Sequence, residues 1–142
     1  MSTEDPHNLQ RFIAAQAQDY ESALGELMAG RKESHWIWYV FPQVAGLGYS
    51  SMAERYSIRD RAEAIAYMEH EVLGARLIEC SAAVLRIADR RIEDVMGSPD
   101  DMKLRSSMTL FKAVSPSGSV FEQVLDRFYS GYEDAKTIEF LG

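Results

Sequence analysis

The residues of this sequence that are best suited to chemistry lie in and around an aromatic segment, Ser34–Gln43, which reads SHWIWYVFPQ. Tryptophan and tyrosine fill protein cores, but they also line ligand pockets, where their polar atoms form hydrogen bonds. We expect most of the apolar run to pack in the core. His35 at one end can titrate near neutral pH, and Gln43 at the other end can donate or accept a hydrogen bond. The candidate ligand-binding residues of this segment are Trp36, Trp38, Tyr39 and Gln43.

A glycine-rich turn, Gly46–Ser51, follows the aromatic segment. Backbone amides next to glycine can approach a small anion before a helix, so we expect Gly48 and Ser50 to contact a ligand. The turn lacks the third glycine of a dinucleotide fingerprint and the Gly-Lys-Ser/Thr ending of a phosphate-binding loop. A plain turn with a serine that caps the next helix is the alternative.

Three further side chains are candidates for a site. On a helix, Lys103 shares a face with Ser106 and Ser107. A Ser–Lys nucleophile pair would need a buried, activated lysine, and small serines that let two helices approach closely are the better interpretation. If the protein binds a small ligand, we expect Lys103 to contact it. Glu54 is the candidate for a catalytic carboxylate. His35 is the second catalytic candidate, and the catalytic residues are otherwise unknown.

The histidines and the single cysteine do not have the spacing of metal ligands, so we expect no metal site. His70-Glu71 lacks the second histidine of a helical zinc-protease motif, because Gly74 stands at that position. No G-x-S-x-G nucleophile motif is present. The sequence therefore predicts no cofactor and no metal.

The overall charge narrows the range of partners. The formal net charge is −7, which repels a phosphate backbone and disfavours general nucleic-acid binding or an anionic membrane surface. It leaves room for a local basic pocket that takes a small phosphorylated ligand. Cys80 has no partner for an internal disulfide, and no stretch approaches the roughly 20 apolar residues of a membrane span. We expect a cytoplasmic protein that does not enter a membrane.

Helical periodicity runs through most of the chain and predicts an all-α fold of six to eight helices in one domain, residues 1–142, with the first seven residues flexible. Two stripes near the N-terminus, separated at Gln18–Asp19, predict two helices, of which the second ends at Gly30. Trp36–Phe41 has strand propensity, but a lone buried strand leaves its backbone unpaired. We therefore expect a short buried helix capped by Ser34, with a two-stranded ribbon as the alternative. The clearest stripe is Leu73, Leu77, Cys80, Val84 and Ile87.

Several long segments carry a family resemblance. The string SHWIWYVFPQ, then GLGYSSMAERYSI, AYMEHEVLGARLIEC, DDMKLRSSMTLF and FEQVLDRFYSGYEDAKTIEFL resemble the domain of unknown function 1810 family of small bacterial and fungal proteins. Members sometimes carry the label calpastatin, but that inhibitor is a disordered repeat protein and this chain has one core. The run Ser51–Ile58 and the Gly74–Leu77 region are also faintly similar to a helical family proposed to handle ADP-ribose and related N-glycosides. That likeness implies a role for Glu54.

Two functions of different classes follow from these observations. The first is the binding or processing of a nucleotide-like or ADP-ribose-like small ligand. The alternative is a non-catalytic protein-interaction module, which the acidic composition and helical build would suit. The sequence sets neither the ligand nor the oligomeric state.

Overall fold

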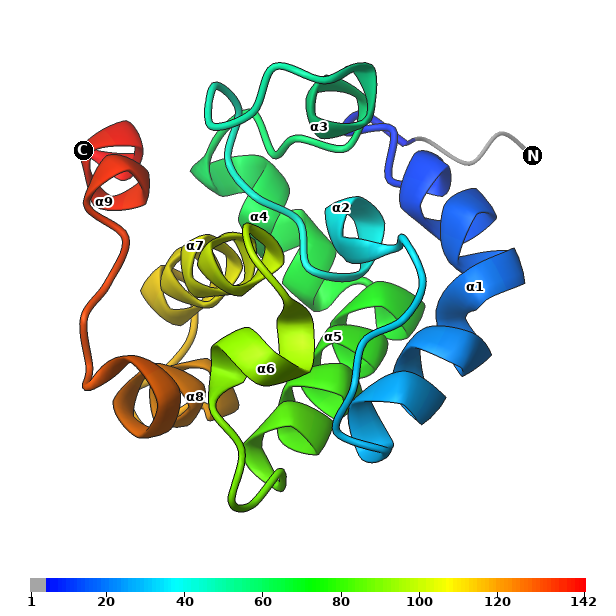
Figure 1. The fold of residues 1–142 in the computed structure, drawn as a ribbon. Coiled ribbons are helices and arrows are strands. Elements are labelled where there is room, and N and C mark those ends of the chain that lie inside the picture. The colour runs from blue at the N-terminus through cyan, green and yellow to red at the C-terminus, as the bar shows by residue number, and fades with distance from the viewer. Residues whose placement is uncertain (1–4) are drawn as a thin grey trace.

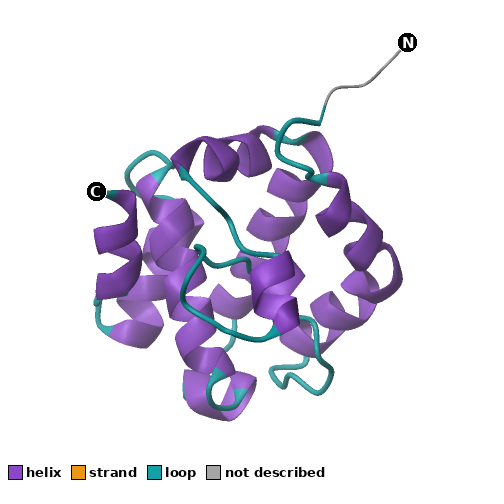
Figure 2. Cartoon of the chain, turned by 90° about the horizontal axis from the view of Figure 1, so that it is seen from above, coloured by secondary structure: helices purple, strands orange, loops and turns teal. Residues whose placement is uncertain are grey.

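The computed structural model describes residues 5–142, in which every regular element is a helix (Figure 2). The prediction of an all-α fold is confirmed. Of the nine helices in this range, six have seven or more residues and three have only four or five. The helices are α1 Gln10–Met28, α2 Ile37–Val40, α3 Ser51–Arg55, α4 Arg61–Glu69, α5 Glu71–Leu85, α6 Ile92–Met96, α7 Asp100–Ala113, α8 Val120–Tyr129 and α9 Ala135–Leu141.

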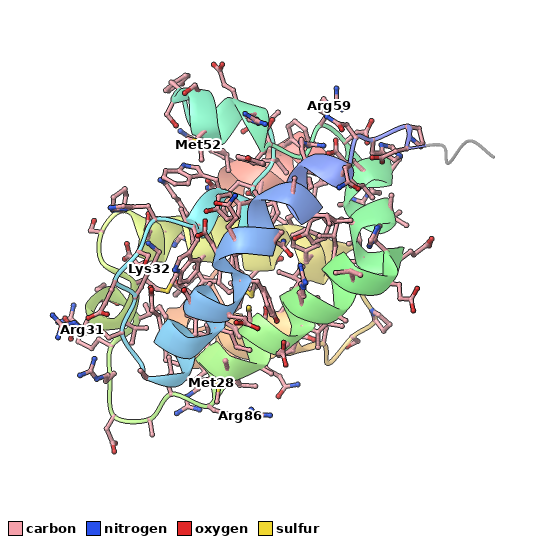
Figure 3. The ribbon with its side chains drawn as sticks, turned by 90° about the vertical axis from the view of Figure 1, so that its right-hand side faces the viewer. Met28, Arg31, Lys32, Met52, Arg59 and Arg86 are labelled. Atoms are coloured by element: carbon pink, nitrogen blue, oxygen red, sulfur yellow. The ribbon has the colours of Figure 1, made fainter. Side chains whose placement is uncertain are left out.

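Helix α5 lies at the centre of the molecule, where it packs against α1, α4 and α8 (Figure 1). Helix α7 is the second organising element, because it contacts α4, α6, α8 and α9. Met28, the last residue of α1, and Arg86, which follows α5, lie at one end of the molecule, and Met52 and Arg59 lie at the other (Figure 3). The short helix α9 stands at the edge of the fold (Figure 1).

The five-residue apolar stripe of the sequence is the buried face of α5 and its end. Each of its side chains is at most 8% exposed. The helix begins at His70, whose Nδ1 accepts hydrogen bonds from the backbone N–H groups of Val72 and Leu73 at 3.1 and 3.3 Å. Gly74 in the first turn lets α5 approach the end of α4, because a Cβ there would lie 2.2 Å from the carbonyl oxygen of Met68.

The division of the N-terminal region into two helices is wrong. Helix α1 runs without a break through Gln18–Asp19. The reason is that the residues between the two apolar stripes include four alanines, which favour a helix, and that the buried Gln16 continues the inward face. Gln16 donates to the backbone carbonyl of Tyr39 at 2.7 Å. The helix ends as predicted at Gly30, whose φ is 76°.

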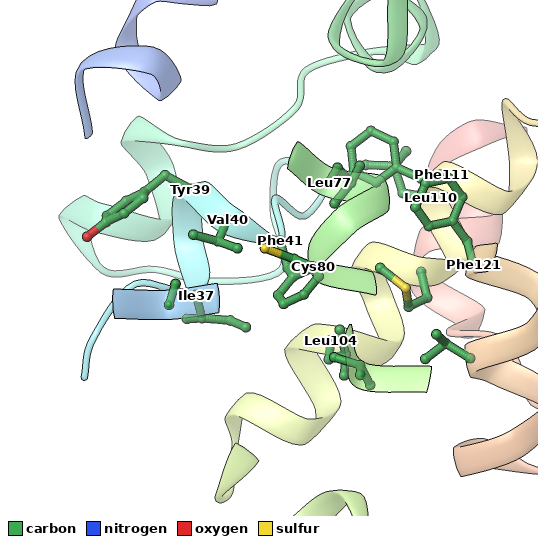
Figure 4. Close-up of a cluster of buried hydrophobic side chains, with 14 of the residues drawn as sticks. Ile37, Tyr39, Val40, Phe41, Leu77, Cys80, Leu104, Leu110, Phe111 and Phe121 are labelled. Carbon is green, nitrogen blue, oxygen red and sulfur yellow. The ribbon is translucent and has the colours of Figure 1, made fainter. Parts of the chain in front are cut away.

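The aromatic run forms a helix and not a strand. Helix α2 is one turn long and packs against α1, α5 and α7, so that Ile37, Val40 and Phe41 enter the main core (Figure 4). The expected cap by Ser34 is wrong, since the Ser34 hydroxyl donates to Glu26 at 2.5 Å. Within the described residues, strand-like pairing is limited to one bridge between Val44 and Ile58.

A buried ion pair connects the beginning of α1 to α4. The carboxylate of Glu63 is 1% exposed and accepts a hydrogen bond from Arg11 at 2.6 Å. The same guanidinium donates to four backbone carbonyls, at His7, Asn8, Arg55 and Ser57. The N-terminal segment is thus held from His7 onward, while residues 1–4, part of the segment expected to be flexible, lie outside the described residues.

Candidate ligand-binding cleft

A cleft of about 390 Å³ lies where the segment after α2 meets the beginnings of α7 and α9. The segment after α2 and the start of α3 supply one wall, α7 supplies the second, and the start of α9 supplies the third. Its lining residues are Gln43, Leu47, Gly48, Tyr49, Ser50, Ala53, Pro99, Met102, Lys103, Ser106, Asp134 and Lys136. Four of the seven predicted ligand-binding residues are among them: Gln43, Gly48, Ser50 and Lys103.

Lys103 is held in the cleft wall by two contacts. Its ammonium lies 3.5 Å from the carboxylate of Asp100 and 5.2 Å from the centre of the Trp38 ring. A cation near a tryptophan face is stabilised by the ring quadrupole. Trp38 is half-buried and does not itself line the cleft, and its indole N–H is buried without a hydrogen-bond partner among the described residues. Trp38 thus supports Lys103 from behind.

A buried lysine shares the carboxylate that positions Lys103. The ammonium of Lys32 lies 2.8 Å from Asp100 and its side chain is 5% exposed. It also donates to the carbonyl of Ser34 at 2.6 Å and lies 4.9 Å from the ring centre of Trp36. Asp100 therefore faces two cations, so its negative charge is more than balanced on this side of the cleft.

The third wall brings one more cation and one carboxylate. Lys136 is exposed and makes no ion pair within 4 Å among residues 5–142. The Asp134 carboxylate caps α9, because it accepts hydrogen bonds from the Thr137 amide and hydroxyl at 3.1 and 2.5 Å. Arg105 lies 3.8 Å from the same carboxylate. The lining therefore carries two ammonium groups and one neutralised carboxylate, in a chain whose net charge is −7.

The glycine-rich turn has a fixed shape at the cleft. A Cβ at Gly48 would lie 2.7 Å from the Cβ of Ala53, so the turn approaches α3 too closely for any other residue. The Ser50 hydroxyl accepts a hydrogen bond from the Ala53 amide at 3.1 Å, which is the capping role named as the alternative. The carbonyl of Gln43 accepts from the Ile58 amide at 2.8 Å and leaves its side-chain amide free to line the cleft.

Two of the aromatic residues that were predicted to bind a ligand lie away from the cleft. Trp36 is fully buried and donates its indole N–H to Glu26 at 2.9 Å. Tyr39 is 5% exposed, and its hydroxyl donates to Asp19. Burial, together with this hydrogen bond and the charge of Asp19, raises the pKa of Tyr39. The structure thus brings Trp38, of the three predicted rings, nearest to the cleft.

The predicted catalytic candidates do not meet. Glu54 lines a separate pocket of about 160 Å³ with Arg11, Arg55 and Arg59. His35 is exposed, and its side chain makes no hydrogen bond within the described part of the chain. Ser106 lines the cleft, but its hydroxyl donates to the carbonyl of Met102 at 3.1 Å, as serines in helices commonly do. The structure therefore assembles no nucleophile–base pair from these groups.

Among the lining residues that the sequence did not predict are two large exposed side chains, Tyr49 and Met102, and two charged ones, Asp134 and Lys136. Tyr49 had a signal, since it is an aromatic residue between Gly48 and Ser50 in a turn that was already a candidate. Lys136 had none, because it is nearly ninety residues from that turn and reaches the cleft only through the packing of α9 on α7.

No group of three His, Cys, Asp or Glu side chains among residues 5–142 is arranged to hold a metal ion. None of the helices described is both long enough and apolar enough to cross a bilayer.

The fold and the cleft define a small all-helical protein whose cleft carries two ammonium groups. The chain belongs to the family described as protein of unknown function (DUF1810), whose model matches residues 6–141. It is similar to the conserved hypothetical protein Rv1873 from Mycobacterium tuberculosis, whose crystal structure shares 48% sequence identity with a TM-score of 0.95. That match covers 96% of this chain and 98% of the mycobacterial chain. No curated protein matches.

Proposed function

We propose that this protein binds a small phosphorylated ligand, nucleotide-like or ADP-ribose-like, in the cleft between the segment after α2 and helices α7 and α9. The observation that carries the proposal is the placement of Lys103 and Lys136 on two walls of one cleft. Hydrogen bonds from a lysine to a phosphate are charge-assisted and roughly twice as strong as neutral ones. Gln43 and Ser50 add neutral polar groups on the remaining wall.

The carboxylates favour binding over glycosidic cleavage. Hydrolysis needs a carboxyl group that is free to move a proton at the reacting bond. Asp134 caps α9, and Asp100 holds two lysines. Glu54, the candidate from sequence, lines a different pocket. The proposal is therefore a binding protein without a catalytic step.

The alternative of a protein-interaction module has less support. Large apolar side chains that are well exposed come from five different helices and two loops. Isolated exposed apolar residues are normal on a soluble domain, and a docking groove needs a contiguous patch. The cleft instead mixes apolar and charged groups.

Thermal denaturation with and without ligand tests the proposal. We expect millimolar inorganic phosphate, ribose 5-phosphate, a nucleoside monophosphate or ADP-ribose to raise Tm at constant ionic strength, because a ligand that binds only the folded state stabilises it. Sodium chloride at the same ionic strength is the control. If none of these phosphorylated compounds raises Tm, the proposal is wrong.

Helix α7 offers a matched pair of variants that locates the site. Lys103→Met removes the cleft lysine, whereas Lys112→Met removes a lysine of the same helix with similar exposure, 31% against 26%, and a similar ion pair, 3.7 against 3.5 Å. We expect Lys103→Met to weaken phosphate binding by about tenfold or more, as loss of a charge-assisted hydrogen bond does. Lys112→Met should bind as the wild type does. Equal effects of the two variants would refute a site at this cleft.

A further inference from the structure

One aromatic side chain at the cleft is unusually exposed for its size. Tyr49 is 89% exposed, the most of any large apolar residue in the described part of the chain, and it lines the cleft that also holds Lys103 and Lys136. Among residues 5–142 it makes no hydrogen bond, and it is not part of the hydrophobic core. Its flat faces are open for contact with a flat group of a ligand.

The backbone on both sides of Tyr49 is fixed, so that this exposure is a property of the fold and not of a loose tip. Gly48 is packed against Ala53 so closely that a Cβ would not fit. Ser50 caps α3 through its hydrogen bond to the Ala53 amide. A side chain on backbone that is held in this way loses less conformational entropy on binding than one on a mobile loop, because the backbone is already ordered.

A second exposed apolar side chain lines the same cleft from α7. Met102 is 46% exposed and directly precedes Lys103. Tyrosine and methionine both contact flat rings well, the first by stacking and the second through its polarisable sulfur. The cleft thus combines apolar surfaces on two walls with ammonium groups on two walls, α7 contributing one of each.

We infer that Tyr49 and Met102 bind the ring of a nucleoside monophosphate whose phosphate is bound by Lys103 and Lys136. This inference rests on the proposed function and names the ligand class more closely. The cleft volume of about 390 Å³ is near the lower end of the roughly 300–1,000 Å³ that small-ligand pockets occupy. This volume suits a nucleoside monophosphate better than ADP-ribose, which carries a second ribose and a second phosphate. The buried Trp36 and Tyr39 are not available for this contact.

Isothermal titration calorimetry with four probes at one ionic strength tests the inference. The probes are inorganic phosphate, ribose 5-phosphate, adenosine 5′-monophosphate and ADP-ribose. We expect the monophosphate to bind about tenfold more tightly than ribose 5-phosphate, since stacking of one base on an aromatic side chain has an effect of that order. ADP-ribose should bind no more tightly than the monophosphate.

Variants of Tyr49 assign that difference to its ring. Tyr49→Ala should bring the affinity for the monophosphate close to that for ribose 5-phosphate, while Tyr49→Phe keeps the wild-type difference. Tyr132→Ala is the control, because Tyr132 is also a loop tyrosine and is 71% exposed, but does not line the cleft. It should bind as the wild type does. Because both tyrosines are so exposed, all three variants should keep the wild-type Tm without ligand.

The results separate the two proposals. If no phosphorylated probe binds, the proposed function fails. If ribose 5-phosphate binds as tightly as the monophosphate, or if Tyr49→Ala leaves the difference unchanged, the proposed function stands and the ring inference is overturned. Tighter binding of ADP-ribose than of the monophosphate would overturn the assignment of the ligand class.

Discussion

The contact between α4 and α5 at Gly74 leads to a prediction with a definite sign. Gly74→Ala places a methyl group 2.2 Å from the carbonyl oxygen and 3.0 Å from the carbonyl carbon of Met68. Cβ atoms in real proteins essentially never come closer than 3.0 Å to another heavy atom. The atoms it meets belong to the backbone of α4, so no side-chain rotation can relieve the clash, and the two helices must move apart by roughly 1 Å.

The expected loss of stability is the difference of two effects. Overpacking of this kind costs about 1–3 kcal/mol, and a rigid backbone neighbour places Gly74→Ala in the upper part of that range. Alanine in place of glycine in a helix contributes up to about 1 kcal/mol in the opposite direction. We therefore expect a net loss of about 2 kcal/mol in the free energy of unfolding. For a domain of this size, that corresponds to a fall in Tm of roughly 5–10 °C.

Helix α1 provides the control for this prediction. Gly25 is also a helical glycine, but a Cβ there would have no heavy atom within 4 Å. Gly25→Ala should therefore raise the free energy of unfolding by about 0.5–1 kcal/mol. Urea unfolding followed by far-UV circular dichroism measures both variants. A Gly74→Ala protein as stable as the wild type would refute the argument from close approach.

Two further predictions concern the carboxylates of Glu26, which is partly buried, and Glu63, which is fully buried. Burial alone would raise the pKa of Glu26, but hydrogen bonds from the Ser34 hydroxyl and amide, the Glu33 amide and the Trp36 indole outweigh it and lower the pKa from 4.5 to about 2. Because the folded-state pKa is lowered, this stabilisation is present above pH 4.5 and is lost as the pH falls towards 2. It amounts to at most about 3 kcal/mol. Urea unfolding between pH 6 and 2.5 should therefore show a smaller loss of folding stability in Glu26→Gln than in the wild type. For the buried Arg11–Glu63 pair, Glu63→Ala should cost about 3–5 kcal/mol, because it leaves a buried guanidinium without its partner. The double variant Arg11→Met with Glu63→Ala should lose less than the sum of the single losses; strict additivity in chemical denaturation would contradict a direct pairing.

Local signals in the sequence were sufficient for most of the helices. The period of the α5 stripe places its apolar residues on one side only if the segment is a helix. Asp60 and Ser119, each three residues before a glutamate in the sequence, accept hydrogen bonds from the Glu63 and Glu122 amides at 2.8 and 3.3 Å and so cap α4 and α8. Such signals are readable because caps and stripes involve residues three or four apart. They were less reliable in α1, because the helix continues through the alanine-rich residues that separate its two apolar stripes.

Local signals in the sequence were not sufficient to predict the structure of the aromatic segment. Its composition could not separate a strand from a helix, since β propensity mostly reflects packing on neighbours. In the structure, contacts with α1, α5 and α7 surround one helical turn, and they bury Trp36 and Tyr39 while Trp38 remains half-buried beside Lys103. Which ring of an apolar run faces a cleft depends on those neighbours.

By itself, the sequence determined that the chain is helical, and it predicted Gln43, Gly48, Ser50 and Lys103 as ligand contacts. Only the tertiary structure decided that these four residues share one cleft, that Glu54 and His35 lie outside it, and that Tyr49 and Lys136 belong to it. The reason is physical: helix formation depends on neighbours within a turn or two, whereas a cleft is formed by elements that are distant in sequence and are brought together by burial of their apolar faces.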